Sequence, residues 1–224
     1  MSRSFTPLPA YRNRREAGQS LAAALRPVVQ GKPIVLALPR GGVPVAYEVA
    51  RSFDSPLDLV MVRKIGAPGH EEFAIGAVVD GLTPQWVVDQ RMAAQFDVPR
   101  SWFEEEKQRQ LEEIERRRAV YCGDRPPLDI AGREVIVVDD GVVTGNTAKA
   151  ALTALTQSGP DRLIFAVPVG AQDSLDELRP MVDELVCPLA PDQFRAVGQH
   201  YQDFGQTTDA EVVDLLGKAR EALR

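Results

Sequence analysis

The 224-residue sequence is poor in the residues that build metal centres and disulfide-stabilised folds. It contains only two cysteines, Cys122 and Cys187, and only two histidines, His70 and His200. Neither cysteine has metal-ligand spacing around it, so a zinc site is not expected. Two cysteines could pair, but reduced thiols in a cytosolic protein are the simpler interpretation.

The sequence also lacks long apolar runs and an excess of basic residues. Its longest apolar runs, such as 135–138, are far too short to span a membrane, and the polar residues 1–15 contain no signal-peptide core. The formal charge is -6. This acidic balance argues against nucleic-acid and membrane-surface binding, although a local basic pocket for phosphates is compatible with it. We therefore expect a cytoplasmic protein without membrane or nucleic-acid partners.

What the sequence does contain is an alternation of short apolar runs with helical patterns. With 44% hydrophobic and 26% charged residues, it has the composition of an ordinary globular domain. The alternation predicts an α/β fold, a mainly parallel twisted sheet flanked by helices. Strands are expected at 34–38, 57–62, 134–138, 162–169 and 184–186, a hairpin at 73–79 and 85–88, and helices at 16–25, 43–52, 101–121, 147–157 and 209–223.

The domain organisation follows from the lengths of the connections. We expect one domain over 1–224, with a hairpin and helix insertion at about 65–121 and a small hood with the last helix at about 188–224. In the insertion, Ser101 and Glu104 match a capping box at the start of a long charged helix. Whether this helix is a lid, a dimer surface or only a solvated helix is left open, and so is a homodimer.

The most informative segment follows the apolar run 134–138. Asp139 and Asp140 come directly after it, and in an open parallel sheet ligands bind beyond the carboxyl ends of the strands. A glycine-containing turn then leads into a helix, whose first N–H groups and dipole attract an anion. Thr144 and Thr147 add hydroxyl donors. A phosphate in the turn and sugar hydroxyls on the aspartates together describe a phosphorylated ribose.

Other interpretations of this segment explain less of it. A Walker A loop requires Gly-Lys-Ser/Thr, whereas the sequence has Gly145-Asn146-Thr147, and the three glycines of a dinucleotide-binding turn are absent. A buried strand, an Asp-Gly turn and a threonine cap would explain any one part of the string. The complete string from Asp139 to Thr147 favours a ligand site.

The segment from Val137 to Thr147 resembles the binding signature for phosphoribosyl pyrophosphate (PRPP) in type I phosphoribosyltransferases. The resemblance extends over nearly the whole chain, and 39–46, 63–69 and 74–78 resemble a little-characterised bacterial group of that family. It implies the type I fold and transfer of the phosphoribosyl group of PRPP to a nitrogenous base, with release of pyrophosphate. It also implies Mg²⁺ as cofactor, with PRPP and an unknown base as small-molecule substrates.

The resemblance also implies roles for individual residues. The turn Arg40-Gly41-Gly42 would bind pyrophosphate, helped by Arg63-Lys64 after the second strand. Asp139 and Asp140 would hold the ribose and bias the metal, and with Lys64 they form the catalytic set. The implied PRPP-binding residues are Arg40, Gly41, Gly42, Arg63, Lys64, Asp139, Asp140, Gly141, Val142, Val143, Thr144, Gly145, Asn146 and Thr147.

Two features leave the activity open. Hypoxanthine-guanine enzymes of the family carry an aspartate just before the Thr-Gly pair, where this sequence has Val143, so a carboxylate base for a 6-oxopurine is missing. Aromatic residues in the hood (Phe194, Tyr201, Phe204) either stack on a base or pack the hood itself. The alternatives are a PRPP- or nucleotide-sensing regulator without turnover and, less favoured, a different α/β enzyme with Asp139 as nucleophile.

Overall fold

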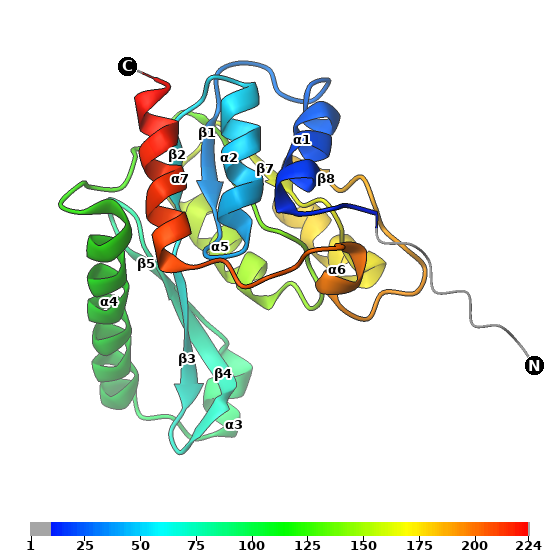
Figure 1. Cartoon of the computed structure of the whole chain (residues 1–224). Coiled ribbons are helices and arrows are strands. Elements are labelled where there is room, and N and C mark those ends of the chain that lie inside the picture. The colour runs from blue at the N-terminus through cyan, green and yellow to red at the C-terminus, as the bar shows by residue number, and fades with distance from the viewer. Residues whose placement is uncertain (1–9, 224) are drawn as a thin grey trace, which may run out of the picture.

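The computed structural model describes residues 10–223 and contains a five-stranded parallel sheet (Figure 1). The strands are β1 (Ile34–Ala37), β2 (Leu57–Leu59), β6 (Glu134–Val138), β7 (Arg162–Ala166) and β8 (Glu184–Val186). Their order in the sheet is β2-β1-β6-β7-β8. The predicted α/β class with a mainly parallel sheet is confirmed.

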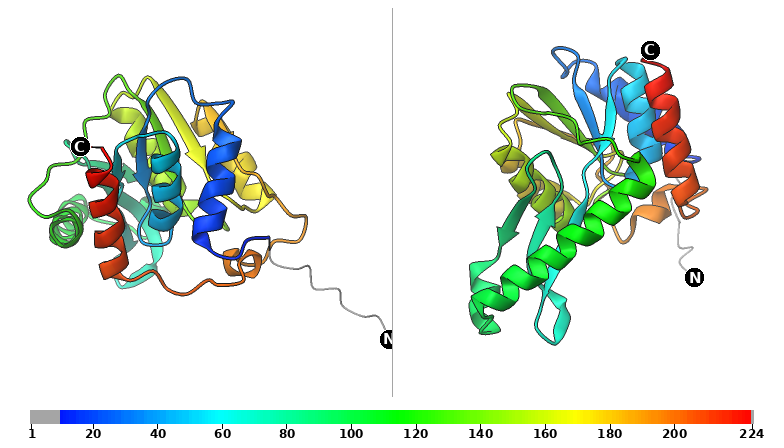
Figure 2. Two further views of the ribbon diagram at one scale, coloured as in Figure 1. Left: turned by 45° about the horizontal axis from the view of Figure 1, so that its top comes forward. Right: turned by 90° about the vertical axis from the view of Figure 1, so that its left-hand side faces the viewer.

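Helices cover both faces of this sheet (Figure 2). One face packs against α1 (Arg14–Leu25), α2 (Gly42–Ser52) and α7 (Asp209–Glu221), and the other against α5 (Asn146–Gln157) and α6 (Gln172–Leu178). Side chains of a strand alternate between faces, so strands buried on both sides are apolar throughout. Val35, Ala37, Ile136 and Val138 face the first group of helices, and Ile34, Leu36, Val135 and Val137 face the second.

A second, three-stranded antiparallel sheet lies between β2 and β6 in the sequence and extends away from the first sheet in Figure 1. It consists of β3 (Val62–Ala67), β4 (His70–Val79) and β5 (Gln85–Val88), which include the expected hairpin. The short α3 (Gln90–Gln95) and the long α4 (Arg100–Cys122) follow. The division into one domain with an insertion and a hood stays a prediction.

The expected strand 57–62 is wrong, because the chain changes sheets within it. Strand β2 ends at Leu59, and the N–H of Met61 turns aside to donate to Asp80 Oδ1 at 2.6 Å. Residues on both sides of this bend are buried, so the apolar run gives no sign of the change of sheet. Arg63 and Lys64 therefore lie inside β3 and do not end a strand.

The expected capping box at Ser101 is also wrong. Helix α4 begins at Arg100, and its N-cap Pro99, which has extended backbone angles, forms no side-chain cap. Ser101 is thus inside the first turn. Two short helices were not expected at all, α3 and α6, since neither is long enough to show a clear apolar period.

Helix α4 is tied to the first sheet by a buried ionic cluster of Arg118, Asp58 and Asp80. Arg118 Nη2 donates to both Asp58 oxygens at 2.9 and 2.7 Å, and Nη1 donates to Asp80 Oδ2 at 2.9 Å. All three side chains are less than one tenth exposed. Two carboxylates thus share one guanidinium, and burial raises the pKa of Asp80 to about 6 despite the contact with Arg118.

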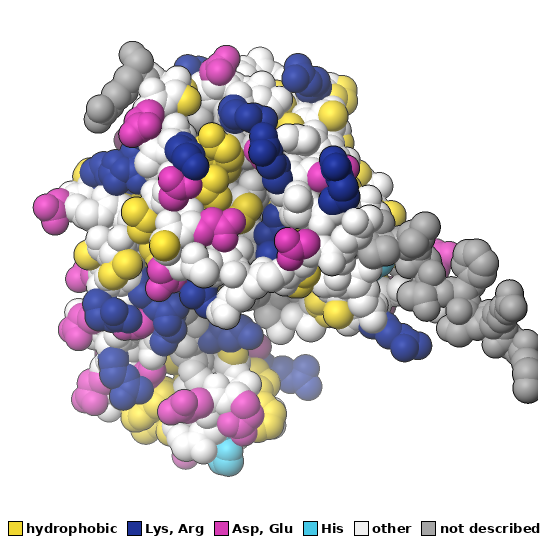
Figure 3. Space-filling model, in the orientation of Figure 1, with side chains coloured by type: hydrophobic (Ala, Val, Ile, Leu, Met, Phe, Trp, Pro, Cys, Tyr) yellow, Lys and Arg dark blue, Asp and Glu magenta, His cyan; other side chains and the backbone are white. Residues whose placement is uncertain are grey.

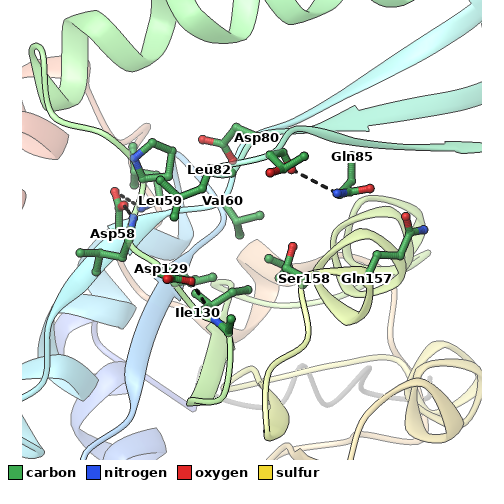
Figure 4. A pocket seen from close by; sticks show the side chains of 17 residues that line it. Asp58, Leu59, Val60, Asp80, Leu82, Gln85, Asp129, Ile130, Gln157 and Ser158 are labelled. Carbon is green, nitrogen blue, oxygen red and sulfur yellow. Dashed lines mark hydrogen bonds between the residues drawn. The ribbon is translucent and has the colours of Figure 1, made fainter.

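The same two aspartates line a cavity of about 420 Å³ between the β4–β5 turn, the segment before β6 and the end of α5 (Figure 4). Among the described residues that line it there is no lysine, arginine or histidine. Gln157 and Ser158, at the C-terminal end of α5, form its far wall. The cavity therefore lies at the opposite end of α5 from the loop after β6.

The raised pKa of Asp80 gives stability a defined pH dependence. The folded state binds a proton between the ordinary value of 3.8 and about 6, so this contribution to the free energy of unfolding is present below about pH 4 and is lost as pH rises through about 6. Asp80→Asn should remove it. Urea unfolding at pH 7 and pH 5 should show wild type gaining about 1.4 kcal/mol relative to the variant at the lower pH, because the pH crosses about one unit below the raised pKa.

The control for this measurement is Asp124→Asn, which removes an exposed aspartate from the loop after α4. Its unfolding free energy should follow that of wild type at both pH values. Parallel pH profiles of wild type and Asp80→Asn would contradict the assignment of a raised pKa to Asp80.

Within residues 10–223, no helix is both long and apolar enough to cross a membrane. The cytoplasmic location and the homodimer stay predictions. Residues 1–9, which contribute to the expectation of no signal peptide, lie outside the described residues.

Candidate functional site

The site expected from the sequence lies where the order of the sheet reverses. Strands β1 and β6 are parallel neighbours with Ala37 opposite Val138, and the chain proceeds from β1 to β2 on one side and from β6 to β7 on the other. In open α/β sheets this switch point is where ligands bind. The turn 39–41 and the loop 139–145 leave the sheet side by side there.

Two glycines allow these segments to touch. A Cβ on Gly42 would lie 2.7 Å from the carbonyl oxygen of Val138 and 2.9 Å from the Cα of Asp139, and a Cβ on Gly41 would overlap Asp140 Oδ2. Only a residue without a side chain fits at such distances. The predicted location of Arg40-Gly41-Gly42 and the aspartate pair at one edge of the sheet is thus confirmed. Their roles in ligand binding stay predictions.

Gly42→Ala should damage both the fold and the site, because its obstacles are backbone atoms that cannot rotate away. We expect the variant to lose about 1 to 3 kcal/mol of unfolding free energy and most ligand affinity. Gly31→Ala is the matched control, since a Cβ there meets nothing within 4 Å. Thermal unfolding of both variants checks the prediction, and equal stabilities would contradict the close approach.

The two aspartates have different surroundings. Asp139 Oδ1 accepts the N–H of Asp140 at 2.8 Å, and burial together with the neighbouring Asp140 carboxylate raises the pKa of Asp139 well above its ordinary value. Burial also raises the pKa of Asp140, while Arg14 opposes the rise by donating from Nε to Oδ2 at 2.8 Å. The pair can accept hydrogen bonds and can neutralise a positive charge.

Arg14 and the segment after β8 close over the pair, a contact that the sequence did not reveal. Arg14 also donates to the carbonyl of Gly205 at 2.7 Å and stacks on the ring of Phe204, 3.9 Å from its centre. The hydroxyl of Tyr201 donates to the carbonyl of Asp140 at 2.6 Å. Two hood aromatics thus hold the aspartate loop in this structure, which favours packing of the hood over base stacking for Tyr201, buried at 4% exposure.

The loop after the aspartates ends in a helix start open to an anion. Gly145 is the N-cap of α5 with a φ of 67°, a left-handed conformation natural to glycine, and no side chain caps the helix. The hydroxyl-bearing Thr144 and Thr147 are near these N–H groups, at either side of the helix start. Val143 is exposed, at 42%. This arrangement offers several donors to a phosphate.

The two basic residues of β3, Arg63 and Lys64, lie on opposite sides of the strand. Arg63 lines a cavity together with Arg40 and Thr147, and its Nε donates to Gln110 of α4 at 2.9 Å. Lys64 is exposed and, one residue along the strand, points to the opposite side of the sheet. The structure therefore brings Arg63 to the turn Arg40-Gly41-Gly42 but does not bring Lys64 there, and the catalytic role of Lys64 stays a prediction.

A parallel sheet with this strand order, an acidic loop at the switch point and a glycine turn facing it define the type I phosphoribosyltransferase fold. The sequence model described as "Phosphoribosyl transferase domain" matches residues 15–203. This chain belongs to the phosphoribosyl transferase family.

Several relatives resemble the chain over most or part of its length. Two Mycobacterium tuberculosis proteins, named as putative phosphoribosyl transferases, are 39% identical over 210 residues, 93% of this chain and 47% of theirs. The chain thus spans about half the length of these curated relatives. The crystal structure of TT1426 from Thermus thermophilus is 43% identical, with a TM-score of 0.82 over 93% of this chain and 98% of that one. A uracil phosphoribosyltransferase of Caulobacter vibrioides is 46% identical over 55 residues, 25% of this chain and 26% of its own.

Proposed function

We propose that this protein transfers the phosphoribosyl group of PRPP to a nitrogenous base and releases pyrophosphate. The observation that carries the proposal is the contact between Asp139-Asp140 and the turn Arg40-Gly41-Gly42 at the switch point of the sheet. One element accepts sugar hydroxyls and the other admits a diphosphate to its backbone, so both halves of the donor have a place.

The residues of the loop suggest how the donor is oriented. The uncapped N–H groups of α5, with Thr144 and Thr147, take the 5′-phosphate, and the carboxylates of Asp139 and Asp140 accept the ribose hydroxyls. The anomeric carbon then lies toward Arg40, whose guanidinium can stabilise the departing pyrophosphate. The contribution of the protein is positioning and electrostatic stabilisation, without a covalent intermediate.

The residues of the site are compatible with Mg²⁺, the cofactor that the family implies. Among the described residues no group of three or more His, Cys, Asp or Glu side chains could form a complete metal cage. Mg²⁺ at phosphates needs only one or two carboxylates, because substrate oxygens and waters complete its coordination. Asp139 and Asp140 would hold it, and it would neutralise charge on the diphosphate.

The acceptor base is not identified by the site. Val143 is the residue at the place of the aspartate found in hypoxanthine-guanine enzymes, and its exposed side chain offers no proton acceptor to a 6-oxopurine. The backbone carbonyl of Val143 accepts the hydroxyl of Ser174, which fixes the loop. The proposal therefore names the donor and leaves purine, pyrimidine and pyridine bases to be tested.

The test is to measure binding of Mg-PRPP by calorimetry and then release of pyrophosphate with a panel of bases. Binding followed by release with at least one base supports the proposed transfer. Binding without release from any base identifies a sensing protein of the same fold. No binding at millimolar PRPP would overturn the proposal.

A further inference from the structure

A groove rich in arginine adjoins the glycine turn and continues along α4 beyond Arg40 and Arg63. Two cavities, of about 70 and 220 Å³, share Arg40, Arg117 and Tyr121 in their walls. The smaller one reaches Arg63 and Thr147, beside the start of α5, and the larger one reaches Arg116 and Asp209. Figure 3 shows Lys and Arg side chains gathered beside α4 at the level where the two sheets meet.

We propose that α4 supplies the second wall of the pyrophosphate site, with Arg117 and Tyr121 facing Arg40, and that the carboxylate of Asp209 occupies the place of a phosphate oxygen until the ligand arrives. The inference rests on the proposed function, because it completes the site of the leaving group. It goes beyond that function by assigning binding residues on the inserted helix and a competing carboxylate on α7.

Arg117 is held ready to bind an anion. Its Nε donates to Glu113 at 2.7 Å, and Arg116 holds the other oxygen of the same carboxylate from its own Nε at 2.7 Å. These two contacts lower the pKa of Glu113 to about 2, so it is a fixed anion that orients both guanidiniums. Among the described residues, none accepts a hydrogen bond from the terminal nitrogens of Arg117. A guanidinium oriented by one contact can give its remaining donors to a diphosphate.

Asp209 makes the contacts that a phosphate oxygen would make. Its Oδ1 accepts from Tyr121 at 2.7 Å and from Arg40 Nη1 at 3.2 Å. Hydrogen bonds from Tyr121 and Arg40 lower the pKa of Asp209, so it is ionised at neutral pH. Its side chain is 57% exposed, and it can therefore move aside. Arg40, Arg116 and Arg117 line the larger cavity together with Asp209, and a diphosphate that displaced Asp209 would give Arg40 a new anionic partner.

Charged residues of α4 that lie outside the groove show how Arg117 differs from an ordinary surface arginine. Arg109 lies two turns earlier on the same helix, pairs with Glu106 and is 70% exposed, but it lines neither cavity. Pairs such as Arg109 with Glu106 are typical of any solvent-exposed helix with alternating charges. The groove differs because Arg117 lines both cavities together with Arg40 of the glycine turn, and Thr147 lines the smaller one.

The experiment measures binding of inorganic pyrophosphate in metal-free buffer, and separately binding of ribose 5-phosphate, by calorimetry. Arg117→Gln should weaken pyrophosphate binding about 10- to 100-fold and leave ribose 5-phosphate unchanged. Arg109→Gln, the matched control, should leave both unchanged. Equal pyrophosphate affinities for wild type and Arg117→Gln, or no pyrophosphate binding by wild type, would overturn the inference.

Asp209→Asn tests the second half of the proposal, because removal of the competing charge should strengthen pyrophosphate binding about 3- to 10-fold. Asp214→Asn, also on α7 but paired with Lys218 outside the groove, is its control. An affinity that falls or stays constant in Asp209→Asn would overturn the role of Asp209. If pyrophosphate binds through Arg117 while PRPP and ribose 5-phosphate do not bind, the proposed function fails and the anion groove stands.

Discussion

Replacing Asp139 and Asp140 together by asparagine should lower the affinity for Mg-PRPP by roughly 100-fold or more. Each carboxylate is expected to accept a ribose hydroxyl, and such a charge-assisted hydrogen bond contributes about 1.5 to 3 kcal/mol. An amide oxygen at the same position keeps the shape but makes a weaker, neutral bond. Calorimetric titration with Mg-PRPP measures the difference.

The design needs a control for charge and for folding. Asp124→Asn removes one negative charge from the exposed loop after α4 and should bind PRPP like wild type. The double variant leaves Arg14 without its carboxylate partner, so its thermal unfolding should be compared with that of wild type as well. A double variant that folds and binds PRPP with unchanged affinity would remove both aspartates from the site.

The second large effect concerns stability. Arg118→Met should lower the unfolding free energy by about 3 to 5 kcal/mol, because Asp58 and Asp80 would both remain buried without their cation. Urea unfolding at neutral pH measures the loss. Adding Asp80→Asn to Arg118→Met should restore part of it, since one of the two unpaired charges is then absent.

Arg109→Met is the control on the same helix. Arg109 is 70% exposed and pairs only with Glu106, so its replacement should change stability by less than about 1 kcal/mol. Similar losses for Arg118→Met and Arg109→Met would contradict the assignment of the buried cluster as the anchor of α4.

The fold was predictable where the sequence has strong local signals. Strand 134–138 and the aspartates that follow it were placed correctly, because a fully apolar run followed by adjacent carboxylates is an unambiguous pattern. The bend between β2 and β3 was not predictable. It depends on the N–H of Met61 reaching Asp80, a residue that is distant in sequence, and its flanks are as apolar as a continuous strand.

The candidate site divides in the same way. The segments Arg40-Gly41-Gly42 and Asp139–Thr147 could be found because each is a contiguous motif. Arg14 could not be found, and neither could Arg117 and Asp209 of the proposed anion groove, because their charges look like those of an ordinary helix surface. Only their closeness in space to the glycine turn and the aspartate loop distinguishes them, and a single sequence does not contain that information.

The pairing of β1 with β6 also has a consequence for how the protein folds. The two strands meet although Ala37 and Val138 are far apart in the chain, with the whole second sheet and α4 between them. Closing so long a loop has an entropic cost that grows with its length, and such contacts form slowly. The second sheet pairs strands that are neighbours in the sequence, β3 with β4 and β4 with β5, so it is expected to form earlier and shorten the search. The crevice between the glycine turn and the aspartate loop is then among the last parts of the molecule to be assembled during folding.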